Sequence, residues 1–322
     1  MVVGTGHYLP EKRITNADLE KMVDTSNEWI VTRTGIKERR MADPEQVTSD
    51  FSAAAGIKAL EAADLDPKDV ELIVTGTINP DMKFPSCSVF VQDKIGNKKA
   101  VGFDLAGACC GFIYSLTTAD ALIAAGRFKN ALVIGTELLT RVTDWTDRGT
   151  CILFGDGSGA VVLKKSDGKR GLLSSTMQSD GSLSHLLYYL GEGTKYPASH
   201  ESIDNQYHFL RMNGSDVFKH AVREMANSSF KAIEKAGLKP SDIDFMVPHQ
   251  ANIRIIEATA KRLHLPMEQV VVNIDRTGNT SSASIPIALD EAVREGRIEK
   301  GMNILMAAFG AGLTWGAAVL KF

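Results

Sequence analysis

Cys109 lies where the sequence predicts the first turn of a buried helix. Residues 101–126 read VGFDLAGACCGFIYSLTTADALIAAG, which predicts a short strand, a tight turn and a long, mostly apolar helix ended by a glycine. Unpaired N–H groups and the positive end of the helix dipole favour a thiolate at such a position and can bind an oxyanion. Because most buried cysteines are simply small apolar residues, position alone also allows a structural role.

His249 and Asn279 also lie at places that suit catalysis. His249 follows the apolar segment FMVP, and Asn279 lies in the polar turn DRTGNTSSAS before a predicted helix. With Cys109 they would supply a nucleophile, a proton carrier or hydrogen-bond donor, and a neutral donor. Taken singly, His249 could be a satisfied core histidine and Asn279 a helix cap. Taken together, the three residues favour catalysis.

An internal repeat predicts that these residues meet. The segment KALEAADLDPKDVELIV (58–74) matches KAIEKAGLKPSDIDFMV (231–247) without gaps, 173 positions apart, with eight of seventeen residues identical. This separation maps His249 onto Gly76 and places Asn279 roughly where Cys109 lies in the first copy. We therefore predict two halves, 1–168 with the nucleophile and 169–322 with His and Asn, joined near residues 167–170.

Helices and strands alternate in each copy, which predicts mixed sheets covered by helices. Two copies would stack into a layered α/β protein whose two buried helices lie back to back. The strand ends of both halves would then face one cleft, the usual place for ligands in α/β proteins. We also predict a glycine-rich hairpin at the end of each half, from Gly155 and from Gly310, and a surface excursion over residues 186–206.

Composition and charge exclude several classes of protein. The chain has 322 residues, 44% hydrophobic and 23% charged, and its net charge of −3 gives no support for nucleic-acid binding. No apolar run approaches the roughly 18 residues of a membrane helix, and the first residues lack a signal-peptide pattern. We expect a cytoplasmic protein with no nucleic-acid or membrane partner, although a targeting peptide removed before residue 1 would leave no trace. The four cysteines lack zinc-site or disulfide spacing, so no metal is expected.

Two chemistries use a Cys, His and Asn trio. One is that of papain-like hydrolases, and the separation of 140 residues between Cys109 and His249 falls inside that family's range of about 130–150. However, those proteases carry the cysteine near the mature N-terminus in a C-G-[SA]-C-[WY] motif, whereas here it lies mid-chain in GACCGF. The other is thioester chemistry, in which an active-site thiolate takes up an acyl group and a second thioester supplies a carbanion.

Six segments together resemble one known family closely. They are TSNEWIVTRTGIKERR, FDLAGACCGF, DRGTCILFGDGSGA, VPHQANIRII, DRTGNTSSASIP and AAFGAGLTWG. Over residues 4–322 the sequence is similar to the β-ketoacyl-acyl-carrier-protein synthase III family of the thiolase superfamily. The resemblance implies a homodimer with a thiolase-like, duplicated five-layer αβαβα fold, mixed sheets and buried central helices. It also implies an acyltransferase that starts type II fatty-acid synthesis by condensing an acyl-coenzyme A (acyl-CoA) primer, usually acetyl, with malonyl-acyl-carrier protein.

The resemblance also assigns chemical roles. Cys109 is acylated by the CoA thioester, which is a substrate, so no cofactor is implied. His249 and Asn279 hydrogen-bond the malonyl thioester oxygen and stabilise the enolate left by decarboxylation, which attacks the acyl-cysteine. The backbone N–H groups of Cys109 and Ala311 form a second oxyanion site. The family more often has glycine at position 311, a mild departure because only the backbone is used.

Further residues match ligand contacts of the family. Those for CoA are Trp29 and Arg148 around the adenine, Arg33 near the phosphates, and Thr25 and Asn252 as lesser contacts. Those for the acyl pocket are Phe84, which would reach across the dimer into the partner's pocket, and Phe309. Those for the acidic carrier protein are Lys219, Gln250, Ala251, Asn252, Ile253, Arg254, Lys261 and Arg262.

Alternatives remain within and outside this chemistry. Relatives in the same superfamily use the trio on other primers or make ketone-type products, and the sequence does not distinguish these. A non-catalytic, thiolase-like binding subunit is disfavoured because Cys109, His249 and Asn279 are all present. Cys110, where the family commonly has a small residue such as alanine, receives no role.

Overall fold

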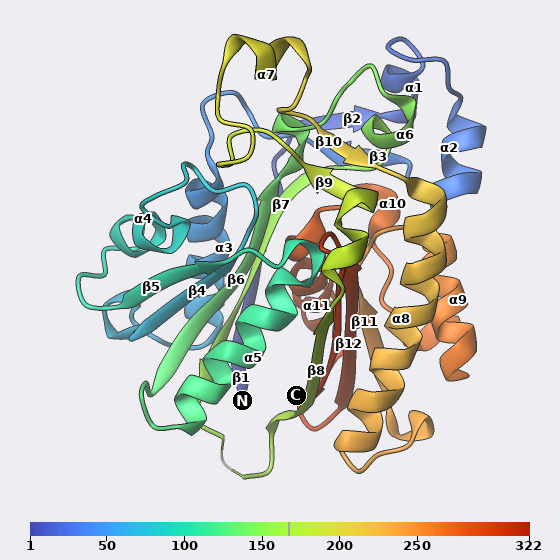
Figure 1. Ribbon diagram of the computed structural model, residues 1–322. Coiled ribbons are helices and arrows are strands. Elements are labelled where there is room, and N and C mark those ends of the chain that lie inside the picture. Colours follow the sequence, from blue (N-terminus) through green and yellow to red (C-terminus); the bar gives the residue numbers. More distant parts are fainter. Residues whose placement is uncertain (167) are drawn as a thin grey trace.

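Two mixed β-sheets form the framework of the computed structural model, which describes residues 1–166 and 168–322 (Figure 1). Asp167, in the predicted junction of the two halves, lies outside the described residues. The first sheet has the order β1-β7-β6-β4-β5. Its strands are β1 (Val2–Tyr8), β4 (Leu72–Gly76), β5 (Val101–Leu105), β6 (Asn130–Leu138) and β7 (Asp156–Lys164). β4 runs parallel to β5 and β6, and β7 runs antiparallel to β1 and β6.

The second sheet repeats most of this arrangement in the order β11-β12-β13-β8. Its strands are β8 (Gly171–Ser179), β11 (Phe245–Pro248), β12 (Asn303–Gly310) and β13 (Thr314–Lys321). β11 and β12 are parallel and the other pairs are antiparallel, as for β4, β6, β7 and β1 in the first sheet. Four strands of each sheet therefore correspond one to one.

Helices cover both sheets and fill the space between them (Figure 1). α3 (Thr48–Ala62) and α4 (Cys87–Lys94) pack on the outer face of the first sheet, and α8 (Gly214–Lys235) and α9 (Ile253–Leu263) lie on the outer side of the second. α5 (Gly111–Ala124) and α11 (Ser284–Arg294) lie between the sheets, and α5 is buried there by the apolar residues on most of its circumference. The predicted five-layer αβαβα fold is confirmed.

Short elements gather near the carboxyl ends of the parallel strands, at the top of Figure 1. They are β2 (Arg13–Thr15), α1 (Asn16–Leu19), α2 (Asn27–Thr34), β3 (Glu38–Arg40), α6 (Arg148–Cys151), β9 (Leu187–Tyr189), α7 (His200–Asp204) and β10 (Leu210–Met212). Part of the region expected to be a surface excursion forms a small ribbon in which β9 pairs with β10. Within the described ranges, no helix combines the length and the hydrophobicity needed to cross a bilayer.

The second sheet has only a remnant of a fifth strand. Val270 makes a single parallel bridge with Met246, where a counterpart of β5 would pair. The buried side chain of Gln250 bonds the backbone that follows, because its Nε2 donates to Val271 O and its Oε1 accepts from Asn273 N–H. The counterpart of β5 is thus reduced to one bridge, since a side-chain amide satisfies the groups that a neighbouring strand would pair.

Corresponding turns precede the two central helices. Ala108 (φ 45°) and Ser281 (φ 49°) are both left-handed, and they are 173 positions apart, as in the sequence repeat. Each opens a 3₁₀ turn that leads into α5 or α11. By this geometry the counterpart of Cys109 is Ser282, and Asn279 lies three residues before it, which refines the equivalence predicted from the sequence.

Only one of the two predicted hairpins exists. β12 ends at Gly310 and turns through residues 311–313 directly into the antiparallel strand β13. In the first half, residues 139–155 separate β6 from β7 and contain α6, so the hairpin predicted at Gly155 is wrong. The reason is that Ile152, Leu153 and Phe154 of this connection fold over the central cavity instead of reversing the chain at once.

Candidate active site

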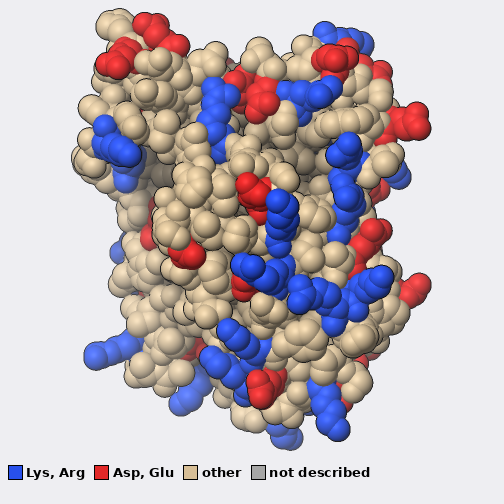
Figure 2. Space-filling model, turned by 45° about the vertical axis from the view of Figure 1, so that its right-hand side comes forward, with Lys and Arg blue, Asp and Glu red and all other residues tan. Residues whose placement is uncertain are grey.

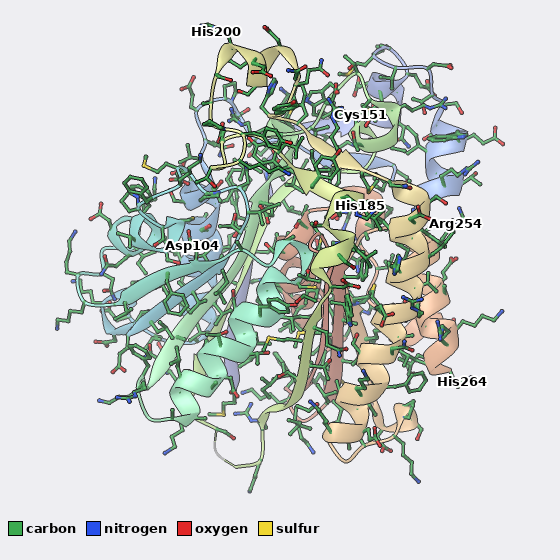
Figure 3. The ribbon with its side chains drawn as sticks, in the orientation of Figure 1. Asp104, Cys151, His185, His200, Arg254 and His264 are labelled. Carbon is green, nitrogen blue, oxygen red and sulfur yellow. The ribbon has the colours of Figure 1, made fainter. Side chains whose placement is uncertain are left out.

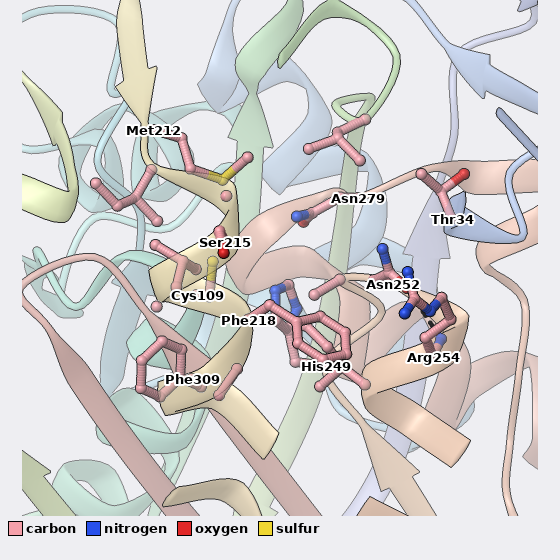
Figure 4. Close-up of a pocket in the computed structure, with 18 of the residues that line it drawn as sticks. Thr34, Cys109, Met212, Ser215, Phe218, His249, Asn252, Arg254, Asn279 and Phe309 are labelled. Atoms are coloured by element: carbon pink, nitrogen blue, oxygen red, sulfur yellow. Dashed lines mark hydrogen bonds between the residues drawn. The ribbon is translucent and has the colours of Figure 1, made fainter. Parts of the chain in front are cut away.

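Cys109, His249 and Asn279 line one cavity of about 460 Å³ (Figure 4). They come from the turn before α5, from the residue after β11, and from the segment between α10 (Ile274–Thr277) and α11. Cys109 is 8% exposed, Asn279 6% and His249 1%, so all three are largely removed from water. The structure therefore brings together the three residues that the sequence singled out.

Gly310 allows the turn after β12 to lie directly against Cys109. A Cβ atom at position 310 would come within 2.7 Å of Cys109 Cβ and 2.9 Å of Cys109 N, so a side chain there would displace the cysteine. Ala311, the predicted backbone donor to an oxyanion, is the next residue of this turn. The glycine thus places the two predicted oxyanion donors on adjoining backbone segments.

Cys109 is a thiol, not a thiolate, in the resting site. Burial raises its pKa to about 12, a hydrogen bond from Ser281 Oγ lowers it, and the nearby Glu137 carboxyl raises it. We expected the helix N-terminus to favour the thiolate, but the loss of hydration outweighs that effect here. The thiol must therefore lose its proton when it reacts. Cys110 does not share this position, because it is packed in the core between the sheets.

His249 is neutral, and its hydrogen bonds fix its tautomer. Burial lowers its pKa to about 3, and its Nδ1 lies 2.7 Å from Ser284 Oγ. Ser284 Oγ also accepts from Gln250 N–H at 3.3 Å, so its own hydrogen is available for Nδ1 of the imidazole. The network therefore assigns the histidine proton to Nε2, which makes His249 a neutral hydrogen-bond donor toward the cavity.

Asn279 is anchored through its backbone to the other half of the chain. Its N–H donates to Leu153 O at 2.8 Å, and its carbonyl accepts from Gly155 N–H at 3.0 Å. Its side-chain Oδ1 accepts from Ser281 N–H at 2.9 Å. Because Oδ1 of the side-chain amide already accepts the bond from Ser281, the NH₂ group is the part that can donate to a ligand.

Three cationic side chains line the same cavity, namely Arg33, Lys219 and Arg254. Arg254 projects from the start of α9 toward α8 (Figure 3), where its guanidinium lies 5.2 Å from the ring centroid of Phe218. A cationic rim around a largely apolar cavity suits a ligand with an anionic end and an acyl end.

Trp29 lies close to both arginines predicted to act with it. Its ring centroid is 5.0 Å from the guanidinium carbon of Arg148 and 5.5 Å from that of Arg33. A flat base between Trp29 and Arg148 would need about 7 Å, two contacts of about 3.5 Å each. Arg148, now held by a 2.9 Å hydrogen bond to Asp24 O, would have to move to admit it.

Of the two residues predicted as lesser CoA contacts, one has an unpartnered polar atom and the other is already hydrogen-bonded within the protein. Within the described residues, Thr25 Oγ1 is buried without a hydrogen-bond partner, so a ligand could satisfy it. Asn252 instead caps α9 by accepting from Arg254 N–H, and it donates to Arg33 O. Its side chain therefore joins α9 to α2.

The two aromatic residues predicted for the acyl pocket lie in very different surroundings. Phe309 is 4% exposed, lines the cavity and stacks near Trp315 with ring centroids 6.3 Å apart. Phe84 is 83% exposed in the loop before α4. A second cavity of about 330 Å³, lined by Ala108, Ala311 and several apolar residues, adjoins the turn that carries Cys109.

The basic residues predicted to contact the carrier protein lie on α8 and α9. Figure 2 shows a band of Lys and Arg side chains across the face on which these helices lie. Lys219, Arg254, Lys261 and Arg262 are exposed there. Gln250 is a correction, because it is fully buried with its amide bonded to backbone groups, so it cannot form part of a docking surface.

Sequence reasoning missed Glu137, Ser281 and Ser284. All three are buried and lie within two hydrogen bonds of Cys109, His249 or Asn279. The serines lie in a run of small polar residues in which no single position stands out. Glu137 could have been found from the sequence, since it is the one charged residue in the apolar segment NALVIGTEL. Among residues 1–166 and 168–322, no three His, Cys, Asp or Glu side chains are arranged to hold a metal ion.

Fold and site together define a thiolase-like condensing enzyme. The chain matches the family described as 3-oxoacyl-[acyl-carrier-protein (ACP)] synthase III over residues 103–181 and that family's C-terminal region over 233–322. It is 51% identical over 321 residues to the beta-ketoacyl-[acyl-carrier-protein] synthase III of Caldanaerobacter subterraneus subsp. tengcongensis, covering 100% of this chain and 97% of that one.

Solved structures agree with this assignment. The crystal structure of 3-oxoacyl-[acyl-carrier-protein] synthase III from Aquifex aeolicus VF5 is similar with a TM-score of 0.92 at 47% identity, over 100% of this chain and 99% of that one. The priming beta-ketosynthase of the R1128 polyketide pathway has a TM-score of 0.92 at 38% identity, over 99% and 95%. The chain belongs to the β-ketoacyl-acyl-carrier-protein synthase III family, and it is the acyltransferase that initiates fatty-acid synthesis.

Replacing Ser284 tests how the tautomer of His249 is fixed. In the wild type, nitrogen-15 chemical shifts of the His249 ring should show one neutral tautomer protonated at Nε2, unchanged from about pH 5 to 9 because the pKa is about 3. In Ser284→Ala, Nδ1 loses its partner, so both tautomers should be populated. Ser115→Ala, at a buried serine of α5, is the control. A single unchanged tautomer in Ser284→Ala would contradict the assignment.

Proposed function

We propose that this chain condenses an acyl-CoA primer, with acetyl-CoA as the first candidate, with malonyl-acyl-carrier protein. The products are 3-oxoacyl-carrier protein, carbon dioxide and free CoA. The observation that carries the proposal is that Cys109, His249 and Asn279 converge in one cavity with a cationic rim. A nucleophile and two neutral donors around one space match a reaction that proceeds through an acyl-enzyme and an enolate.

In the first half-reaction, Cys109 Sγ attacks the thioester carbonyl of the primer. The N–H groups of Cys109 and Ala311 hold the resulting oxyanion, and CoA leaves with the electron pair of the broken C–S bond. Arg33 suits the phosphates, and Trp29 and Arg148 present a flat face and a planar cation to the adenine. The unpartnered hydroxyl of Thr25 supports a further contact in the same place.

In the second half-reaction, His249 Nε2–H and the amide of Asn279 donate to the malonyl thioester oxygen. These bonds strengthen as negative charge develops on that oxygen during loss of carbon dioxide, and one such donor is worth about 2.7 to 4 kcal/mol. Decarboxylation makes the carbanion without a strong base, which is consistent with a histidine that stays neutral. The enolate carbon then attacks the acyl group on Cys109.

Carrier-protein docking is proposed for the α8 and α9 face. Lys219 and Arg254 lie beside the cavity, and Lys261 and Arg262 extend the positive charge along α9. Ala251, Asn252 and Ile253 are partly exposed between them. An acidic carrier protein would be steered to such a surface, and its tethered malonyl group could enter the adjacent cavity.

We propose that the chain acts as a homodimer formed along β5. This strand is an edge of the first sheet, and Val101 on it is 50% exposed. Phe84 (83%) and Met82 (51%) lie exposed in the loop before α4. The unpaired edge of a sheet can pair with another chain, and a second copy bound there would place Phe84 at its partner's acyl pocket.

The halves 1–168 and 169–322 are proposed as the products of a duplication, with the nucleophile in one and the two donors in the other. We also propose that the protein acts in the cytoplasm, in keeping with its bacterial relatives.

A second candidate function is the priming of another acyl chain, favoured by the likeness to a priming ketosynthase of a polyketide pathway. Discrimination between primers by one methylene is worth only about 1 to 3 kcal/mol, so small changes in the acyl pocket decide it.

The two donors should be needed for decarboxylation more than for acylation. Asn279→Ala or His249→Ala should slow release of carbon dioxide from malonyl-acyl-carrier protein by about 100- to 1,000-fold, because each removes a donor to the enolate oxygen. Acylation by acetyl-CoA should persist. Radiolabelled carbon dioxide and intact-protein mass measure the two steps, with Asn205→Ala, at the C-terminal cap of α7, as the matched control. Release at the wild-type rate in both cavity variants would refute the proposed role.

Removing the charge of Arg254 should weaken carrier-protein binding selectively. An exposed charge contact is worth up to about 1 kcal/mol, so Arg254→Ala should raise KM for malonyl-acyl-carrier protein roughly two- to fivefold and weaken its dependence on salt. Acylation by acetyl-CoA should change less. Lys98→Ala, which removes an exposed positive charge between α4 and β5, on the opposite side of Figure 1 from α8 and α9, is the control. Equal losses in both half-reactions would mean that Arg254 supports the cavity, and the docking surface would have to be moved.

A further inference from the structure

We propose that Ser281 and Glu137 form a proton relay that accepts the proton of the Cys109 thiol. Ser281 Oγ lies 3.5 Å from Cys109 Sγ and 3.5 Å from Glu137 Oε1, so one hydroxyl bridges the nucleophile and a buried carboxyl group. The inference extends the proposed function, since it assumes that Cys109 is the acyl carrier. It makes Ser281 a catalytic residue and Glu137 a positioning residue that acts through it.

The bridging hydroxyl is held by a strained backbone. Ser281 has a φ of 49°, which is unfavourable for a residue with a Cβ atom, and it is only 2% exposed. Its N–H bonds the side chain of Asn279, so the same residue orients one proposed donor and contacts the nucleophile. Strain of about 1 to 3 kcal/mol persists only where the surroundings hold it, and it concentrates at functional sites.

Glu137 is a carboxyl group buried without a compensating cation. It lies near the end of β6, has no exposed surface, and accepts from Ile78 N–H at 3.2 Å and from Thr77 Oγ1 at 3.3 Å. Within the described chain, no Lys or Arg forms an ion pair with it. The buried Asp290, by contrast, is bonded by both His7 and Arg294.

The titratable groups that face Glu137 are two thiols. Cys109 and Cys87 both interact with its charge, and the hydroxyls of Thr77, Ser281 and Ser282 complete its surroundings. Asp156, on the neighbouring strand β7, is directed instead to Thr140 and to the backbone of Ala42. Both carboxyl oxygens of Glu137 accept hydrogen bonds, and a buried carboxyl group without a cation is suited to exchange a proton.

Glu137 is also poised to change its protonation state near neutral pH. Burial raises its pKa to about 8, and its hydrogen bonds lower it in part. Below about pH 8 the acid form predominates and cannot accept a proton. As pH rises through this value the carboxylate forms, so the relay becomes competent with increasing pH.

The relay moves one proton from Cys109 to Glu137 in two linked transfers. The Cys109 S–H bond breaks and its proton moves to Ser281 Oγ, while the hydroxyl proton of Ser281 moves to Glu137 Oε1. The Sγ electron pair forms the bond to the thioester carbonyl carbon. The CoA thiolate leaves with the electrons of the broken C–S bond, and the same relay in reverse returns the proton to it.

The test is alkylation of Cys109 by iodoacetamide, followed by mass spectrometry that locates the adduct. This reaction needs the thiolate but no acyl-CoA, so failure of the relay and failure of the proposed function are distinguishable. The wild-type rate should rise with pH through a midpoint near 8. Glu137→Gln should lose this midpoint and react at least about tenfold more slowly at pH 8 to 9, because the amide cannot accept the proton.

The sign of this change separates the relay from simple electrostatics. The charge of Glu137 raises the pKa of Cys109, so its removal without a relay would make the thiol more reactive, not less. Unchanged or faster alkylation in Glu137→Gln at pH 8 to 9, whether or not the midpoint remains, would overturn the proposal.

Neighbouring serines provide a matched control. Ser281→Ala should resemble Glu137→Gln, and the double variant should be no slower than either, because the two residues act in series. If the alanine variant does not fold, Ser281→Gly can replace it, because glycine adopts the left-handed backbone conformation without strain. Ser282→Ala should keep the wild-type profile, since Ser282 contacts Glu137 but donates mainly to Gly76 O at 2.6 Å. Additive losses, or equal losses in both serine variants, would indicate a structural role only.

Discussion

The site depends on the close approach of two backbone turns, one from each half of the chain. The turn before α5 carries Cys109 and the turn before α11 carries Ser281, and the two pack against each other across the central layer. The approach is possible because a glycine, Gly135, lies where the turn before α11 meets the first sheet. A Cβ atom at Gly135 would lie 2.3 Å from Ser282 O, so even alanine there would force the turns apart. The duplicated fold thereby becomes one active site instead of two separate sheet edges.

Burial sets the charge state of every group at the bottom of this site. It keeps Cys109 as a thiol, His249 neutral and Glu137 largely protonated near neutral pH, while the positive charges stay on the rim. In such a dry cavity neutral donors stabilise a developing oxyanion strongly, because water does not compete for it. The same burial removes the ready-made thiolate, which explains why the nucleophile needs a proton acceptor beside it.

Local pattern and the repeat were sufficient to predict the layered fold and the three residues that line the cavity. A strand, a turn and an apolar helix placed Cys109, and the repeat placed His249 at the matching strand end. What the sequence did not predict depends on contacts between distant segments. Gln250 suited a surface motif, but it is buried because it replaces a missing strand. Ser281 and Ser284 acquire their roles only when the two halves close on each other.

Both half-reactions require that Cys109 carry the acyl group, and covalent capture of that group can be measured. The protein is mixed with acetyl-CoA alone, its intact mass is measured, and the modified peptide is fragmented to separate Cys109 from Cys110. We expect one acetyl group per chain, located on Cys109 and abolished in Cys109→Ala. An acetyl group on Cys110, or no covalent adduct in the active enzyme, would contradict it.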